Sequence, residues 1–288
     1  MGSVDIRRGR AYNQRKKGAV KMLWNTKNGT VKLDGGAMDY VRFGTGGRVL
    51  IMLPGLGDSL RSVRGTALPM AVLYREFSKD FTVYMFSRIA PMGAGYTTRD
   101  MARDQAQAMA LLGIEKADVF GVSMGGMIAQ WLAIDHPERV GRLVLTVTSA
   151  EPNPILTESI EEWVALAKAG DHAGFMASNL ERLYSDGYCR KNGWTVPILG
   201  LLTRPKSYER FFIQAQSCLT HCAATELRRI TARTLVIGGE RDKALGGEAS
   251  RKIAAAIPGA ALNMYPQWGH AVYEEEKTFN RTVLEFLK

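Results

Sequence analysis

Ser123 has the sequence surroundings that most clearly indicate chemistry. It lies in the pentapeptide Gly121-Val-Ser-Met-Gly125, between a short apolar run and a segment with apolar residues at helical spacing. This is the pattern of a nucleophile elbow, a strained turn between a strand and a helix that small residues make possible. The helix that follows would direct its N-terminal N–H groups toward a developing oxyanion. The pattern predicts that Ser123 is a nucleophile for acyl transfer.

A serine nucleophile needs a base in hydrogen-bond contact. Because reactive groups in open parallel sheets gather at the carboxyl ends of strands, the base is expected on a loop that follows a strand. Of the four histidines, His270 directly follows Gly269 on a loop after the last expected strand. We therefore predict that His270 is the base. The other histidines are expected at a helix end (His136), in solvent (His172), and at a packed or surface position (His221).

The base needs an acid that orients it and stabilises its cation. Asp242 is our first choice because it follows the expected strand before the last one, and Glu240 in the same loop is the second. Glu151, after the preceding strand, is the third. The purely structural alternative is an ion pair of Asp242 with a neighbouring basic residue, Arg241 or Lys243.

An oxyanion requires two N–H donors, and each donor typically raises the rate constant of the reaction by a factor of about 10²–10³. One is predicted to be the N–H of Met124, directly after the nucleophile. The other is expected from the glycine-rich loop 54–57, which follows an apolar run at 49–53. Leu56 is our choice in that loop, and Gly55 is predicted to border the substrate.

These groups must be positioned by an alternating series of strands and helices. Strands are expected at 30–33, 38–43, 49–53, 81–86, 119–122, 143–147, 234–237 and 261–265. Helices are expected at 67–77, 98–112, after residue 125, and at 247–257 and 275–287. This alternation predicts an α/β fold with a mostly parallel central sheet and helices on both faces.

Residues 151–225 interrupt the alternation, because they contain no convincing strand and have helical spacing at 159–169, 173–184 and 208–218. We interpret 151–225 as an inserted helical lid. The core would then comprise 26–150 and 226–288, preceded by a basic extension at 1–25. Three lid residues are candidates to face substrate, with packing in the core of the lid as the alternative: Trp163, Phe175 and Tyr184.

The net charge of +10 is concentrated at the N-terminus. Residues 1–32 hold nine Lys or Arg against one acid, which is +8 and leaves +2 for the rest of the 288-residue chain. We interpret the extension as a solvated arm and predict no nucleic-acid partner. The predicted partner is a small-molecule substrate, and the sequence leaves monomer and homodimer open.

Other features favour a cytoplasmic protein without a cofactor. No apolar run is long enough to span a bilayer, and no secretory signal is evident. Three cysteines, an odd number, indicate reduced thiols. Cys218, His221 and Cys222 lie in one helical run without a second cluster, so no metal site is predicted.

The combination of motifs resembles the α/β-hydrolase fold superfamily over about residues 30–288. The matching segments, in order, are Leu53-Pro-Gly-Leu-Gly57, Gly121-Val-Ser-Met-Gly-Gly126, Gly239-Glu-Arg-Asp242 and Gly269-His270. The resemblance implies a Ser123–His270–Asp242 triad with Leu56 and Met124 as oxyanion donors, in the serine esterase and enol-lactonase-like branch. Two loops depart from the family pattern: Pro54-Gly55 replaces His-Gly, and 87–95 lacks the common Asp-x-Arg-Gly-x-Gly-x-Ser.

The function expected is hydrolysis of a small, largely apolar carboxylic ester or lactone through an acyl-enzyme intermediate. Rival reactions with the same triad are thioester hydrolysis, hydrolytic C–C cleavage of a β-diketone-like compound, and cofactor-free perhydrolysis. A rival of another class is a low-turnover receptor for a small ligand.

Overall fold

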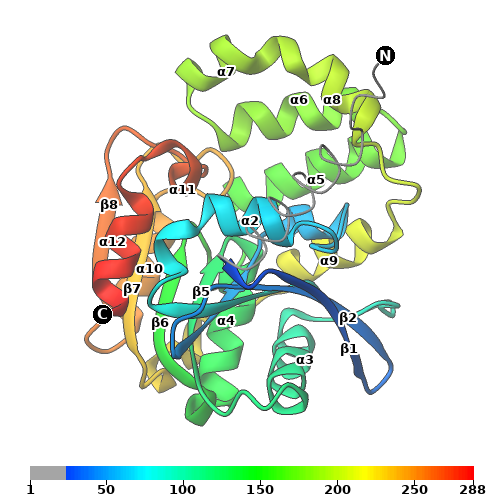
Figure 1. The fold of residues 1–288 in the computed structure, drawn as a ribbon. Helices are drawn as coiled ribbons and strands as arrows, with labels where there is room; N and C mark the ends of the chain where they lie inside the picture. The colour runs from blue at the N-terminus through cyan, green and yellow to red at the C-terminus, as the bar shows by residue number, and fades with distance from the viewer. Residues whose placement is uncertain (1–23) are drawn as a thin grey trace, which may run out of the picture.

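A computed structural model describes residues 24–288, so the predicted basic extension at 1–25 lies almost entirely outside the described residues. The described chain forms an eight-stranded sheet in the order β1-β2-β4-β3-β5-β6-β7-β8 (Figure 1). The strands are β1 (Lys27–Leu33), β2 (Gly36–Phe43), β3 (Arg48–Leu53), β4 (Phe81–Phe86), β5 (Ala117–Val122), β6 (Val140–Thr146), β7 (Arg233–Gly239) and β8 (Ala261–Tyr265). All eight expected strands are present, and the α/β fold class is confirmed.

The sheet is antiparallel at one edge and parallel elsewhere. β1 and β2 form a hairpin in which Leu33 pairs with Gly36, and Gly35 has a positive φ of 88° that glycine adopts readily. β2 pairs antiparallel with β4, whereas the neighbouring pairs from β4 through β8 are parallel. Every residue of β5 is buried, as expected for an apolar strand covered on both faces. The carboxyl ends of β3, β5 and β7 therefore meet at one edge.

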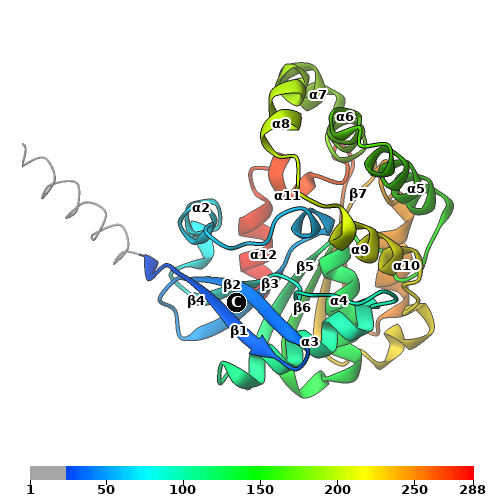
Figure 2. The same ribbon diagram turned by 90° about the vertical axis from the view of Figure 1, so that its right-hand side faces the viewer.

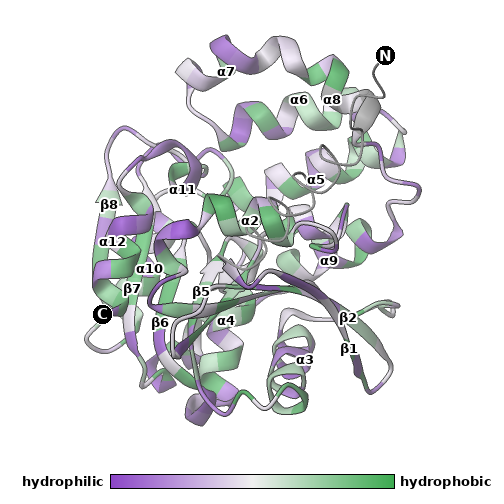
Figure 3. Cartoon of the chain, in the orientation of Figure 1, coloured by the Kyte–Doolittle hydropathy of each residue, from purple (hydrophilic) through white to green (hydrophobic). Residues whose placement is uncertain are grey.

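Helices cover both faces of the sheet (Figure 2). One core joins the sheet to α3 (Thr98–Leu111), α4 (Met124–Asp135) and α10 (Glu248–Ala256). The other core joins the opposite face to α2 (Ala67–Leu73) and α12 (Phe279–Leu287). Nearly all of α4 is buried, and Figure 3 shows it mostly in the hydrophobic colour.

Five helices lie between β6 and β7 and form what we call the helical insertion. They are α5 (Pro154–Lys168), α6 (His172–Leu183), α7 (Asp186–Asn192), α8 (Val196–Leu202) and α9 (Glu209–Leu219). α5 begins earlier than its apolar spacing indicates, because the Asn153 side chain caps the N–H of Leu156. Helices α7 and α8, of seven residues each, were not expected from the sequence. Figure 1 places α6, α7 and α8 farthest from the sheet.

Two expected helices are each broken into two pieces. The helix expected at 67–77 ends at Leu73 and is followed by a 3₁₀ turn at Arg75–Phe77. The helix expected at 275–287 is instead α11 (Val272–Glu275) followed by α12. The Glu276 carboxylate between them accepts hydrogen bonds from the N–H and hydroxyl of Thr278, which favours a break in the helix. Among the described helices, none combines the length and the apolar character required to cross a membrane.

Candidate active site

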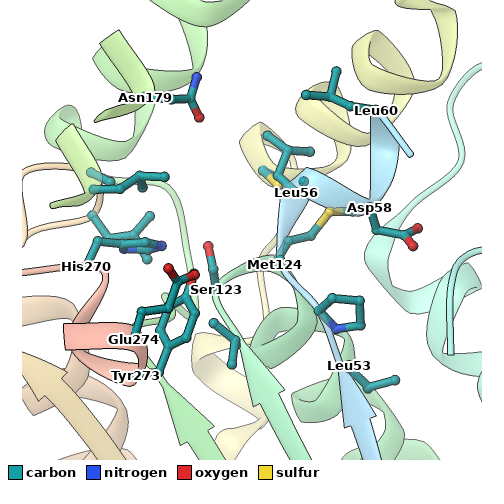
Figure 4. Close-up of a pocket in the computed structure, with 18 of the residues that line it drawn as sticks. Leu53, Leu56, Asp58, Leu60, Ser123, Met124, Asn179, His270, Tyr273 and Glu274 are labelled. Carbon is teal, nitrogen blue, oxygen red and sulfur yellow. The ribbon is translucent and has the colours of Figure 1, made fainter. Parts of the chain in front are cut away.

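A cavity of about 400 Å³ lies at the carboxyl ends of β3 and β5, between the sheet and the helical insertion. Its volume falls in the range of small-molecule sites. Most of the side chains that line it are apolar, and a few polar groups, including Ser123, His270 and Glu274, face into it (Figure 4). The cavity therefore has the shape and chemistry of a site for a small, largely apolar molecule.

Ser123 stands on a strained turn between β5 and α4. Its φ of 54° and ψ of −122° are unusual for a residue with a side chain. The Ser123 N–H is fixed by a 2.9 Å hydrogen bond to the Thr146 carbonyl. A Cβ at Gly125 would lie 1.9 Å from the Leu53 carbonyl oxygen, so only glycine permits this approach of α4 to β3. The motif thus forms the sharp turn that its spacing predicts, with the serine lining the cavity.

His270 and Asp242 form a hydrogen-bonded pair beside the cavity. His270 Nδ1 lies 2.8 Å from Asp242 Oδ2, and both side chains are buried. Asp242 Oδ1 accepts hydrogen bonds of 2.8 and 2.9 Å from the N–H groups of Ala244 and Leu245. An ionised carboxylate can only accept, so Nδ1 carries the proton and Nε2 is left as an acceptor. His270 lines the same cavity as Ser123.

The other acid candidates are placed elsewhere. Glu240 is exposed and forms an ion pair with Arg251, and Glu151 is exposed at the surface. Lys243, proposed as a structural partner for Asp242, instead lies 2.8 Å from Asp186. Of the three carboxylates considered, Asp242 is the one hydrogen-bonded to His270.

Leu56 and Met124 both line the cavity, and each is the first residue of a helix. The first N–H groups of a helix have no acceptor within it, so both are available to an oxyanion. Gly55 lies against the nucleophile, since a Cβ there would be 3.3 Å from the Cβ of Ser123. The backbone of this loop therefore approaches the serine closely.

A buried charged cluster supports the loop that carries Leu56. The Asp58 carboxylate accepts from the Ser87 hydroxyl at 2.5 Å, from the Arg88 N–H at 3.2 Å, and from the Arg210 guanidinium at 2.6 Å. The Arg88 guanidinium donates to the Pro54 carbonyl. Burial lowers the pKa of Arg88, and the negative charge of Asp58 opposes that shift. The unusual 87–95 segment therefore holds the 54–58 loop through its first two residues.

The three predicted residues of the helical insertion all line the cavity. Trp163 and Phe175 are buried, and the Trp163 indole N–H donates to the Ser178 hydroxyl at 3.1 Å. The Tyr184 hydroxyl donates to Glu274 at 2.6 Å, and its ring stacks on Tyr188 with centroids 4.2 Å apart.

The remaining histidines lie outside the cavity. His221 is buried, with Nδ1 2.8 Å from the Thr98 hydroxyl, which agrees with a packed position. The expectation that His172 is solvated is wrong, because it is buried and hydrogen-bonds with Tyr208 and Thr203. His136 lies at the end of α4, as expected. Within residues 24–288, no group of three His, Cys, Asp or Glu side chains is arranged to hold a metal.

Five further side chains of the lining that carry polar groups were not found by sequence reasoning: Asp58, Tyr74, Asn179, Tyr273 and Glu274. Glu274 lies on the short helix α11, whose four residues carry no periodic signal. Its position four residues after His270, one helical turn away, is the feature that could have suggested it.

Comparisons with known proteins agree with this geometry. A family model described as "alpha/beta hydrolase fold" matches residues 48–277, about four fifths of the chain. A protein of Variovorax paradoxus provisionally named carbamate hydrolase RutD is 27% identical, over 69% of this chain and 76% of the relative. The 2-hydroxy-6-oxo-6-phenylhexa-2,4-dienoate hydrolase of Burkholderia cepacia is 29% identical, over 65% of this chain and 68% of the relative.

The fold is also shared with solved structures. The enol-lactonase of Burkholderia xenovorans superposes with a TM-score of 0.76 and 22% sequence identity. The match covers 90% of this chain and 99% of the enol-lactonase.

Proposed function

Because this chain belongs to the alpha/beta hydrolase fold family, we propose that it is a serine hydrolase that cleaves a small, largely apolar carboxylic ester or lactone. The observation that carries this proposal is the His270–Asp242 hydrogen bond beside Ser123, all at the carboxyl ends of the strands. In this proposal the three residues act as nucleophile, base and acid.

The reaction begins when His270 Nε2 takes the proton of the Ser123 hydroxyl as the oxygen attacks the acyl carbon. Asp242 keeps the proton on Nδ1 and stabilises the imidazolium that forms. Two backbone N–H donors to Asp242 hold the carboxylate in place. The imidazolium then gives its proton to the leaving alkoxide, which departs as an alcohol.

The tetrahedral oxyanion rests between the N–H groups of Leu56 and Met124. Met124 begins α4 and Leu56 begins a four-residue 3₁₀ turn (Leu56–Ser59), so both N–H groups lack an acceptor within their own element. The positive end of the α4 dipole also faces the negative charge. A water molecule deprotonated by His270 then attacks the acyl-enzyme. The carboxylic acid leaves and the Ser123 hydroxyl is restored.

The helical insertion is proposed as the lid predicted for residues 151–225, over a core of 26–150 and 226–288. Apolar side chains of α5 and α6, including Trp163 and Phe175, form the wall opposite Ser123. An apolar wall favours an apolar acyl or alcohol group and limits the water around the oxyanion, which strengthens the electrostatic stabilisation.

Hydrolysis of a carbon–carbon bond is the second candidate, because it can use the same nucleophile, base and oxyanion donors. The relative named as a dienoate hydrolase favours it. However, a dienoate carries a carboxylate, and no lysine or arginine is among the described residues that line this cavity. A neutral ester or lactone therefore matches the cavity better.

The test compares wild type with Ser123→Ala on p-nitrophenyl esters of acetic, butyric and hexanoic acids. We expect wild-type turnover and a loss of about 10⁴-fold or more in the variant. A fluorophosphonate should add one covalent label to the peptide containing Ser123 and none in the variant. Absence of turnover on every ester, or equal labelling of both proteins, would refute the proposal.

A further inference from the structure

The cavity contains a carboxyl group that the proposed mechanism does not use. Glu274 lies on α11, one helical turn after His270. Figure 4 shows its carboxylate directed into the same space as the Ser123 hydroxyl. Any acyl compound that reaches Ser123 therefore passes beside Glu274.

Glu274 is held in this orientation by its neighbours. Its Oε2 accepts the 2.6 Å hydrogen bond from the Tyr184 hydroxyl, and its own N–H donates to the Ala271 carbonyl at 2.9 Å. The Glu274 side chain is exposed and borders the cavity. Nearby protein atoms partly exclude water from its carboxyl group, which raises the pKa of Glu274, and hydrogen bonds from Tyr184 and Tyr273 oppose this shift.

No lysine or arginine of the described residues balances the charge of Glu274, and His270 is the basic side chain that acts on it. The groups that act on it are Tyr184, Tyr273, Glu275 and His270, and in the described part of the chain it forms no ion pair with lysine or arginine. The other acidic residue of the lining, Asp58, differs because Arg210 and Arg88 neutralise it. The cavity therefore presents one uncompensated acidic group to a ligand.

We propose that Glu274 determines specificity, so that the cavity takes esters or lactones carrying a neutral hydrogen-bond donor or a cation and rejects those carrying a carboxylate. The reason is that a carboxyl group accepts from N–H and O–H donors and attracts cations, whereas a second carboxylate is repelled where little water screens it. This inference rests on the proposed function, because it concerns substrates that react with Ser123.

The experiment uses three p-nitrophenyl esters of equal acyl length, derived from heptanoic acid, adipic acid monoamide and adipic acid. Each is measured as kcat/KM at pH 8 with background hydrolysis subtracted, and the discrimination ratio is the amide value divided by the carboxylate value. We expect a ratio of about 100 for wild type. Glu274→Gln should lower the ratio at least about tenfold, since it keeps the shape but removes the charge.

Two further variants separate this role from a structural one. Glu274→Asp keeps the charge and should retain most of the discrimination. Glu285→Gln removes an equal charge from an exposed position on α12 and should leave all three rates at wild-type values. Thermal unfolding of each protein checks that it is folded. If Glu274→Gln does not fold, Glu274→Ala, which also removes the charge, takes its place and should lower the ratio by the same factor.

The outcomes distinguish this inference from the proposed function. An unchanged ratio in Glu274→Gln, or a wild type that accepts the carboxylate ester as well as the amide, overturns the role of Glu274 and leaves the serine hydrolase intact. A wild type inactive even on the heptanoate ester overturns both proposals together.

Discussion

The Arg210 guanidinium, on helix α9 of the helical insertion, lies 2.6 Å from the carboxylate of Asp58 in the 54–58 loop. The Asp58 side chain is completely buried, and 152 residues separate the two partners in sequence. The same guanidinium also donates to the Arg88 carbonyl at 3.3 Å. The insertion is thus tied to the loop that carries Leu56 by a partly buried, charge-assisted hydrogen bond.

Replacing Arg210 by methionine should destabilise the fold and weaken catalysis together. Asp58 would keep its bonds to Ser87 and Arg88 but lose one charged donor, which costs about 1–3 kcal/mol of the free energy of unfolding. Urea denaturation and kcat on an ester measure the two effects. The matched control is Arg229→Met, which breaks an exposed ion pair with Glu226. This variant should lower the free energy of unfolding by less than about 1 kcal/mol. Equal losses in both variants would contradict a special role for Arg210.

The acid assignment predicts unequal effects of two neighbouring substitutions. Asp242→Asn should lower kcat by about 10⁴-fold, because an amide no longer holds the productive tautomer of His270. Glu240→Gln should remain near the wild-type rate, since Glu240 pairs with Arg251 at the surface. Steady-state kinetics on one ester decide the matter. Loss of activity in Glu240→Gln alone would mean that the wrong carboxylate has been assigned.

His221 should make the stability of the protein depend on pH in the acid range. Burial lowers the pKa of its imidazole from the ordinary 6.5 to about 3, and a backbone hydrogen bond with Ser149 opposes the shift. The unfolded chain therefore takes up a proton near pH 6.5, whereas the folded chain does so only near pH 3. The contribution of neutral His221 to the free energy of unfolding is therefore fully present above pH 6.5. It decreases as the pH falls from 6.5 toward 3, by at most about 1.4 kcal/mol per pH unit.

The measurement compares wild type with His221→Gln, which preserves a polar group opposite Thr98 but does not titrate. Urea unfolding between pH 7.5 and 4.5 should show the stability advantage of wild type shrinking as the pH falls. A constant difference across this range would show that His221 is not the group responsible.

The sequence predicted those parts of the structure that depend on local pattern. Central strands such as β5 were recognisable because a continuous apolar run between turns leaves few alternatives. Ser123 was recognisable since its turn needs glycine at fixed neighbouring positions. His270 and Asp242 were recognisable because parallel strands bring the loops after them to one edge of the sheet.

Other features depend on contacts between distant segments, which local pattern does not encode. His172 was expected in solvent, yet Tyr208 and Thr203, more than thirty residues further along, enclose it. The bond from Arg210 to Asp58 joins two segments whose separate sequences indicate no partner. Glu274 lines the cavity from the short helix α11, and the Tyr184 hydroxyl, 90 residues earlier in the chain, donates to its carboxylate.

Ser123, Asp242 and His270 follow β5, β7 and β8 of one sheet, whereas Trp163 and Phe175 belong to the segment inserted between β6 and β7. The proposed catalytic residues and part of the cavity wall are therefore encoded on separate stretches of the chain. Substitutions in α5 and α6 can change which molecule fits without moving the groups that transfer protons. The arrangement suits directed evolution, because libraries confined to these two helices can explore new substrates while the catalytic sheet stays constant.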